Sequence, residues 1–384
     1  MQNKIAIVAV AYNRIGPLKR LLVHLSNAYY PDENIPLIIS IDKSDTDEVE
    51  QFADNYQWSH GLKIVDKHQE NLGLRNHMMS LGKWFEEYDA LIILEDDIIP
   101  SPSFYYYAMS ATEKYANNEK VGGISLYNFS IHYATYLNFT PLKSEYDVYL
   151  IRWAMSWGEI WLKNQWEDFY KWYLDNMEFT YDPRIPATLF SWSKKSWLKY
   201  HTRYLIERDK FFVYPYVSLT TNGAEPGEHY KFSDSTFQVP LQYGVKRNFN
   251  MPDSIDDLVC YDEYLENTRL NLSDYANDIC IDLTGSKKDS GGLRYLLTYK
   301  HLNYKIIKSY GASFRPIEVN VIDNVAGSDI FLYDTSVDCR NKIDSLNIQR
   351  YFYSTFNLYW RLKGVGLKNF IHDALIIIKQ KYLK

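Results

Sequence analysis

The chain has 384 residues, of which 46% are hydrophobic and 23% are charged, a balance that is ordinary for a globular protein. This composition excludes a disordered chain, a collagen-like chain and a coiled coil, and the length predicts two domains or one large domain with additions. With 42 basic and 48 acidic residues the formal net charge is −6, so nucleic acid is not the expected partner.

Three cysteines, Cys260, Cys280 and Cys339, are too few and too scattered for a disulfide framework or a zinc site, and they favour a reducing cytoplasm. The longest clean apolar run, Ile5–Tyr12, is much shorter than the roughly 20 residues of a membrane-spanning helix. Arg14 follows that run without a small-residue cleavage site. We therefore interpret the run as a first β-strand and not as a signal peptide.

The first 125 residues alternate short apolar runs with amphipathic stretches. The pattern predicts strands at Ile5–Ala11, Pro36–Asp42, Leu62–Lys67 and Ala90–Leu94, and helices at Pro17–Asn27 and Arg75–Glu87. Strands that alternate with helices predict βαβ units, a mainly parallel sheet and the α/β class.

Polar side chains follow three of these predicted strands. They are Tyr12–Arg14, Asp42–Asp45 and Glu95–Asp97. In open α/β sheets ligands bind at the carboxyl ends of the strands, so we expect these residues to form one site.

The sharpest of these signals is the run Glu95–Asp97, three consecutive carboxylates after an apolar strand. Adjacent acids at a buried strand end repel one another and are costly to desolvate. A bound Mg²⁺ or Mn²⁺ removes that cost, since such ions take one or two carboxylates together with phosphate oxygens. The alternative is a solvated turn in which the acids only cap the next helix.

Four segments in order, Val8–Arg14, Ile39–Asp42, Asn71–Arg75 and Leu94–Asp97, resemble the GT-A glycosyltransferases. The segments are similar to bacterial capsule and cell-surface glycosyltransferases with a Glu-Asp-Asp motif, and to the N-acetylglucosaminyltransferases that start complex N-glycans. The resemblance covers about residues 4–235. It implies a GT-A, Rossmann-like nucleotide-sugar-binding domain with a C-terminal extension.

The resemblance also implies a role for each matching residue. Arg14 and Asp42 would contact the nucleotide base and ribose, and Arg75 would face the nucleotide or its pyrophosphate. Asp96 would reach the ribose or the sugar, and Asp97 would hold Mn²⁺ or Mg²⁺ against the diphosphate, where the ion offsets charge on the leaving group. Taken singly, Asp42 could instead cap a turn and Arg14 could be a surface charge.

Two downstream segments resemble further parts of the family. Arg152–Trp161 is similar to its acceptor segment, although tryptophans at every fourth position also fit a helical core stripe. Pro215–Gly223 is similar to its lid over the donor, and Gly223 and Gly227 would let that loop close on phosphates. His229 is expected at the diphosphate or the metal, with a purely structural histidine as the alternative. The expected nucleotide-sugar-binding set is Arg14, Asp42, Arg75, Glu95, Asp96, Asn222, Gly223 and His229.

An inverting transfer needs a carboxylate that deprotonates the acceptor hydroxyl. The eukaryotic relatives carry it in a Trp-Asp-Asp-Trp segment, but the matching Phe190–Lys194 of this chain contains no acid. Glu159, in the acceptor segment, is our first candidate for the base, followed by Glu225 and Asp182. If none of them serves, the chain would be a retaining enzyme or inactive.

The sequence divides into a catalytic domain at 1–235, an accessory region at 236–345 and a tail at 346–384. The catalytic domain comprises a nucleotide-binding half at 1–125 and an acceptor half with the lid at 126–235. In the accessory region, Arg315–Asn320 after Leu293–Tyr299 also resembles the bacterial members and predicts a docking segment.

The tail is basic and amphipathic, with seven Lys or Arg and one Asp in residues 350–384. One helical face would carry Leu367, Phe370, Ile371, Ala374, Leu375 and Ile378. Such a tail favours an interfacial helix on an anionic membrane, with an ordinary packed helix as the alternative.

The sequence therefore predicts a metal-dependent, inverting glycosyltransferase with Mn²⁺ or Mg²⁺. It would transfer a sugar from a nucleotide sugar, UDP-sugars first, to a surface-glycan acceptor at the inner face of the membrane, and we expect this acceptor to be lipid-linked. The alternatives are a non-catalytic carbohydrate-binding protein on a degenerate GT-A scaffold and a sugar-phosphate nucleotidyltransferase. The latter needs a glycine-rich loop after the first strand, where Ala11–Pro17 has a single glycine.

Overall fold

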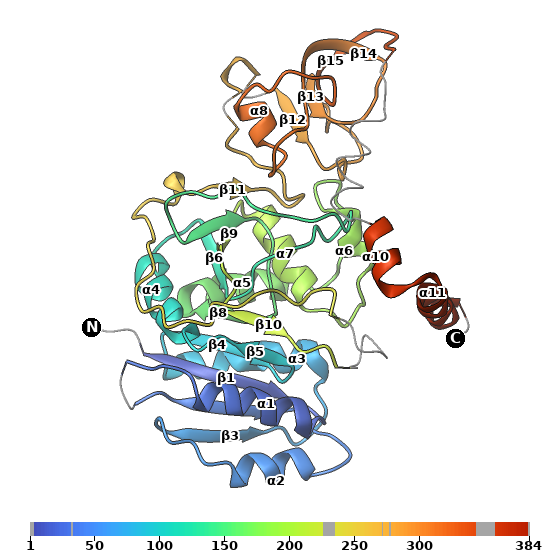
Figure 1. The fold of residues 1–384 in the computed structure, drawn as a ribbon. Helices are drawn as coiled ribbons and strands as arrows, with labels where there is room; N and C mark the ends of the chain where they lie inside the picture. The colour runs from blue at the N-terminus through green and yellow to red at the C-terminus, as the bar shows by residue number, and fades with distance from the viewer. Residues whose placement is uncertain are drawn as a thin grey trace. The chain divides into compact units, whose positions relative to one another are not determined.

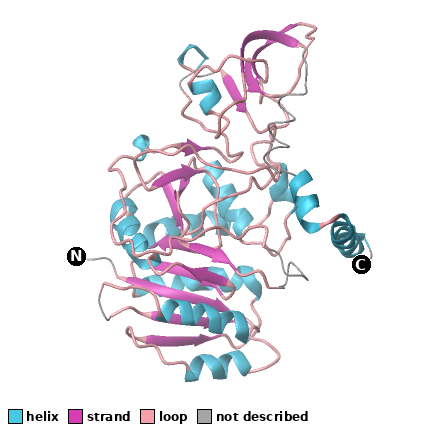
Figure 2. Cartoon of the chain, viewed as in Figure 1, coloured by secondary structure: helices cyan, strands magenta, loops and turns pink. Residues whose placement is uncertain are grey.

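The computed structural model describes residues 4–31, 34–225, 235–270, 272–275, 278–342 and 358–382. The chain divides into two compact units (Figures 1 and 2). Unit 1 consists of Met1–Ser130 and Pro141–Arg269, and unit 2 of Ile131–Thr140 and Leu270–Lys384. Unit 1 thus extends beyond residue 235, where the sequence analysis ended the catalytic domain, because the late strand Cys260–Tyr261 pairs with the main sheet.

Unit 1 is built on a sheet of nine strands in its described part, in the order β11-β7-β9-β6-β8-β4-β1-β2-β3. The strands β3, β2, β1 and β4 are parallel to one another, whereas β8 is antiparallel to both β4 and β6. This confirms the α/β class and the parallel N-terminal half. The bounds are β1 Ile5–Ala11, β2 Leu37–Ile41, β3 Lys63–Lys67, β4 Ala90–Glu95, β6 Val121–Ser125, β7 Val148–Ile151, β8 Glu159–Leu162, β9 Phe211–Pro215 and β11 Cys260–Tyr261.

Helices cover both faces of this sheet, which is why β1 is buried along its whole length. On one face alternate β1 residues, such as Ile7 and Ala9, pack against apolar side chains of α1, α2 and α4. On the other face Trp161 of β8 stacks on Trp166 of α5, and Trp197 lies against it just before α7. The bounds are α1 Ile15–Ser26, α2 Glu48–Asn55, α3 Gly73–Ser80, α4 Phe104–Tyr115, α5 Lys163–Asp175, α6 Ala187–Ser191 and α7 Leu198–Glu207.

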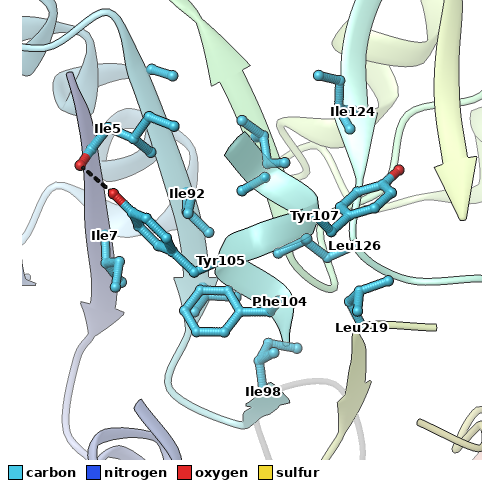
Figure 3. Packing of buried hydrophobic residues seen from close by; sticks show 14 of the residues in the cluster. Ile5, Ile7, Ile92, Ile98, Phe104, Tyr105, Tyr107, Ile124, Leu126 and Leu219 are labelled. Atoms are coloured by element: carbon cyan, nitrogen blue, oxygen red, sulfur yellow. Dashed lines mark hydrogen bonds between the residues drawn. The ribbon is translucent and has the colours of Figure 1, made fainter. Parts of the chain in front are cut away.

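The helix α4 anchors the centre of unit 1 (Figure 3). Its first residues, Phe104 and Tyr105, are buried among apolar side chains of the strands, and the Tyr105 hydroxyl donates a hydrogen bond to the carbonyl of Ile5 at 3.4 Å. Leu219, which precedes β10, belongs to the same cluster. These contacts hold α4 and the residues before β10 in one apolar cluster with Ile98, which follows the acidic run.

Two predicted helical patterns differ from the structure. The expected helix Arg75–Glu87 forms as α3 followed by a 3₁₀ helix, η1, at Leu81–Glu86. The stretch Arg152–Trp161 is not helical, because β7 ends at Ile151 and β8 begins at Glu159, so the four-residue spacing of its tryptophans arises from a bend between two strands.

A short antiparallel ribbon positions the expected lid. β5, Ile98–Pro100, follows the acidic run directly, and it pairs with β10, Thr220–Asn222. Asn222 lies opposite Ile98 in the register. The ribbon therefore brings residue 223 next to Asp97, although the two are far apart in sequence.

Unit 2 contains a four-stranded sheet in its described part, in the order β12-β13-β15-β14. Charged pairs between Lys300 and Asp282 and between Arg294 and Asp334, both at 2.7 Å, join segments within this unit. The bounds are β12 Ile279–Asp282, β13 Tyr295–Thr298, β14 Tyr304–Tyr310, β15 Ile330–Asp338, α8 Val319–Ile322, α10 Leu358–Val365 and α11 Leu367–Tyr382, with two short 3₁₀ turns, η2 Ile255–Asp257 in unit 1 and η3 Ser273–Tyr275 here. Within the described ranges, no helix combines the length and hydropathy that crossing a bilayer requires.

Candidate functional site

The acidic run lies at the carboxyl end of the central strand β4, as the sequence predicts. Glu95 is the last residue of β4, and Asp96 and Asp97 form the turn into β5. The side chain of Asp96 is buried, while that of Asp97 retains 32% of its exposure. Asp97 is therefore the member of this run that is most open to a ligand.

Arg14 binds both aspartates. It lies between β1 and α1, and because β1 pairs with β4 it is close to the end of β4. Its Nε donates to Asp96 at 3.2 Å, its Nη2 pairs with the other oxygen of Asp96, and the same Nη2 donates to Asp97 at 3.1 Å. Burial alone would lower the pKa of Arg14, but the attraction of the two carboxylates outweighs it and raises the pKa, so the guanidinium stays charged. An internal cation thus neutralises part of the acidic run.

The remaining acids of the run respond to the same surroundings. Burial raises the pKa of Asp96 to about 6, and Arg14 limits this shift. Burial, with the negative charges of Asp97 and Asp96, raises the pKa of Glu95 to about 8, despite a hydrogen bond from Ser156 that favours the ionised form. The neutral form of Glu95 is therefore favoured, which reduces the negative charge of the run.

The other side of the site is formed by the residues after β10. The amide of Gly223 donates a hydrogen bond of 2.6 Å to the carbonyl of Asp97. Arg20 of α1 forms an ion pair with Glu225. The ribbon and this ion pair hold 222–225 against the acidic run. The predicted residues Gly227 and His229 lie outside the described residues.

Several polar atoms here are buried and lack a hydrogen-bond partner within the described part of the chain. They are Nη1 of Arg14, Nε and Nη2 of Arg20 and Oδ1 of Asn222. Leaving such atoms unpaired costs free energy, because each has lost its water. The three nitrogens belong to positively charged arginines, and the Asn222 oxygen is an acceptor. Together with the partly exposed carboxylate of Asp97, they suit an anionic polar ligand.

Asp42 is used locally. One carboxylate oxygen accepts from the amides of Lys43 and Leu72 at 3.0 and 2.8 Å, and the other accepts from Gly73 at 2.9 Å. Gly73 has φ +69°, a backbone conformation that glycine adopts without strain. The buried Asp42 therefore fixes the loop 71–73 at the start of α3, and its side chain is partly saturated by backbone donors.

The contacts of Arg75 are with the segment before α7 and with Tyr200 of that helix, and not with the acidic run. Its Nη1 donates to the carbonyl of Lys194 and to the hydroxyl of Tyr200, both at 3.2 Å, and its guanidinium lies over the Tyr200 ring. The structure thus joins α3 to the segment before α7 through Arg75. Lys194 is the last residue of the acid-free stretch Phe190–Lys194.

Glu159 is fully buried in β8. It lies opposite Ile93 of β4 and Ser125 of β6, on the sheet face that also carries Glu95. Neither carboxylate oxygen has a hydrogen-bond partner by distance and angle among the described residues, and burial raises its pKa well above the ordinary range, with Glu95 adding to the shift. Burial therefore favours the neutral form of Glu159, and the candidate base that the sequence favoured has no exposed surface from which to reach a hydroxyl.

The other candidate bases differ in exposure. Glu225 is exposed and paired with Arg20, next to the acidic run. Asp182 pairs with the neighbouring Arg184, which lowers the pKa of Asp182 and makes it a weaker base. In the acceptor segment Trp153 is buried and its carbonyl accepts from Tyr214, while Trp157 packs partly buried against Tyr127.

The residues fit a metal site that is shared with phosphate oxygens, but not one formed by protein side chains alone. Among the described residues, no three His, Cys, Asp or Glu side chains are grouped to hold an ion by themselves. Mg²⁺ and Mn²⁺ accept one or two carboxylates when phosphate oxygens complete the shell. Asp97, with Asp96 behind it, fits an ion that is shared with a diphosphate.

Sequence reasoning missed Arg20 and Ser156. Arg20 meets its partner 205 positions later, and Ser156 reaches Glu95 only through the bend between β7 and β8. No local pattern signals either contact. Their proximity depends on the pairing of β5 with β10 and of β4 with β8.

No family model matches the sequence, and no curated protein does. Solved structures give distant matches. TarS 1-349 of S. aureus in complex with UDP-GlcNAc has a TM-score of 0.38 at 15% identity, over 59% of this chain and 60% of that chain. The mannosyltransferase PcManGT from Pyrobaculum calidifontis, in complex with GDP-Man and Mn²⁺, has a TM-score of 0.33 at 10% identity, over 56% and 58%. The matches span less than two thirds of the length of these neighbours.

Arg14→Gln should strengthen the binding of Mn²⁺ alone. The substitution removes a cation that holds Asp97 and repels an incoming ion, so we expect the affinity to rise at least about fivefold (about 1 kcal/mol). Titration of Mn²⁺ followed by electron paramagnetic resonance measures this without turnover. Adding Asp97→Asn to the variant should abolish the gain, and unchanged or weaker binding by Arg14→Gln would contradict the competition.

Glu159→Gln should change how stability depends on pH. A carboxyl whose pKa is raised by folding ionises more easily in the unfolded chain, so the wild-type protein loses stability as pH rises above the ordinary glutamate pKa. Glutamine cannot ionise, so we expect the stability of the variant relative to the wild type to increase from pH 5 to pH 8. Urea unfolding at both pH values tests this, with the exposed Glu87→Gln as the matched control. Parallel pH profiles for all three proteins would refute it.

Proposed function

We propose that this protein is a metal-dependent glycosyltransferase that transfers a sugar from a nucleotide sugar, UDP-sugars first, to a surface-glycan acceptor. The observation that carries the proposal is the arrangement around Asp97. A partly exposed carboxylate at the end of the central parallel strand lies beside two arginines, and a glycine amide holds the adjoining loop. The order of the sequence motifs, which resembles GT-A enzymes, supports the same conclusion.

In this proposal the diphosphate of the donor occupies the surroundings of Arg14, Arg20 and Asn222. The unpaired guanidinium nitrogens of the two arginines would bind phosphate oxygens, and Asn222 would accept from a donor hydroxyl. Asp97 would hold Mn²⁺ or Mg²⁺, which when bound offsets charge on the leaving diphosphate. When the metal binds, the ion pair between Arg14 and Asp97 would break, whereas the pair between Arg14 and Asp96 would remain. Arg14 and the metal ion would therefore compete for the carboxylate of Asp97.

Asp42 and Arg75 would act on the donor through the backbone that they position. Asp42 fixes Leu72 and Gly73, which lie between the edge strand β3 and the helix α3. Arg75 ties α3 to Tyr200 and Lys194. We propose that loop 71–73 forms the wall for the nucleotide base and that Asp42 sets its shape.

We propose Glu225 as the base, in an inverting displacement. It is exposed beside Asp97, whereas Glu159 is buried and protonated. A base must be ionised and within hydrogen-bond reach of the acceptor hydroxyl. Opening of the Arg20–Glu225 pair as Arg20 turns to the diphosphate would free the carboxylate for that proton.

The acceptor proposed from the sequence is a growing surface glycan carried on a lipid, which places the enzyme in the cytoplasm at the membrane that holds this lipid.

Two observations favour an alternative function. The buried Glu159 and the acid-free Phe190–Lys194 favour a carbohydrate-binding protein on a degenerate scaffold. Such a protein would bind glycan without releasing nucleotide from any donor.

The first test is release of nucleotide from UDP-, GDP-, CMP- and dTDP-sugars, with Mn²⁺ or with EDTA. We expect release from one donor, lost with EDTA and reduced at least about 100-fold by Asp97→Ala, because the leaving diphosphate loses its counter-charge. The exposed Asp175→Ala on α5 is the matched control and should retain activity. No release from any donor, together with no binding of UDP and Mn²⁺ by calorimetry, would overturn the proposal.

Glu225→Gln and Glu159→Gln then separate the two candidate bases. Loss of general base catalysis typically costs 10²–10⁴-fold, so we expect Glu225→Gln to lower kcat by about that much with little change in KM for the donor. Glu159→Gln should remain within about tenfold of the wild type. The opposite ranking in the same assay would assign the base to Glu159.

A further inference from the structure

The helix α11, Leu367–Tyr382, carries an exposed apolar face. Its members are Leu367, Phe370, Ile371, Leu375 and Ile378, and each retains between 43% and 64% of its exposure. Counted from Leu367, they fall three, four, eight and eleven residues along the chain, so they project from the same side of a helix. An apolar stripe of this length is normally covered in a soluble protein, which means that it has an occupant.

The helix is separate from the one before it. α10, Leu358–Val365, ends at Gly366, which has φ +80° and donates its amide to the carbonyl of Leu362 at 2.9 Å. A glycine in this conformation is the usual way to end a helix and turn the chain. α11 can therefore present its apolar face as an independent surface element.

The charge around this face is opposite in sign to that of the whole chain. Residues 350–384 contain seven Lys or Arg and a single Asp, whereas the chain as a whole carries −6. Lys363 and Lys368, at the end of α10 and the start of α11, are exposed. A second copy of this tail would bring two sets of seven basic residues together, and their repulsion disfavours self-association. An anionic surface with an apolar layer beneath it complements both features.

We propose that α11 lies in the interface of an anionic lipid bilayer, with its apolar face among the acyl chains and its basic residues against the headgroups. Helices with this combination of an apolar face and cationic flanks bind in the plane of the interface, and each basic residue adds attraction to anionic lipid. The occupant is lipid and not the sugar acceptor, so this inference does not depend on the proposed glycosyl transfer. It gives the chain a means of reaching a membrane without a spanning helix.

The test uses the full chain and vesicles of phosphatidylcholine alone or with 30% phosphatidylglycerol. In flotation gradients we expect binding at least about tenfold stronger to the anionic vesicles, and weaker binding at 1 M NaCl because salt screens the headgroup attraction. Phe370→Ser with Ile371→Ser should lower binding at least about tenfold. Asn369→Ser with His372→Ser, on the other side of the same helix, is the matched control and should retain binding.

Three results would overturn the proposal. They are failure of the wild-type protein to float with anionic vesicles, equal loss in both double variants, and a change from dimer to monomer in the Phe370 and Ile371 variant by light scattering. The last would identify a second copy as the occupant. Thermal unfolding of each variant, measured in parallel, establishes that unit 1 is folded in every sample, and the nucleotide-release assay reports on the transfer proposal separately.

Discussion

The pairing of Arg14 with Asp96 and Asp97 is the interaction on which the site depends. Three consecutive acids at the end of a buried strand are costly without a counter-charge. The parallel pairing of β1 with β4 brings Arg14 to them, and the amide of Gly223 fixes the Asp97 backbone from the other side. The charge of the acidic run is thus partly neutralised by Arg14, while the side chain of Asp97 remains partly exposed.

The same constraint explains why the acids of this region have different roles. Asp97 is partly exposed, Asp96 is held by Arg14, and Glu95 and Glu159 lie on one face of the sheet, where burial raises the pKa of both. An acid that is neutral and enclosed serves packing, whereas one that is charged and open can bind a ligand. Carboxylates that look equivalent in the sequence are therefore separated by their environments into structural and ligand-facing groups.

Aromatic residues make up 16% of the chain, and many of them pack together in the core of unit 1. Trp161 stacks on Trp166, Phe169 stacks on His201, and Trp172 and Tyr204 join them between the sheet and the helices α5 and α7. The acceptor-like tryptophan Trp153 is buried as well. These rings fill one face of the α/β core. Trp157 is only partly buried and packs against Tyr127.

The sequence by itself determined the strands β1 to β4, the helix α1, the parallel half of the sheet and the position of the acidic run at a strand end. Local apolar periodicity specifies such elements directly. Which acid is open, which arginine neutralises it and why Glu159 is enclosed were decided by the tertiary structure. Those properties depend on pairings such as Arg14 with Asp96 and Arg20 with Glu225, which join residues 82 and 205 positions apart. Burial and charge act through space, and a linear pattern carries no record of the distance between such residues.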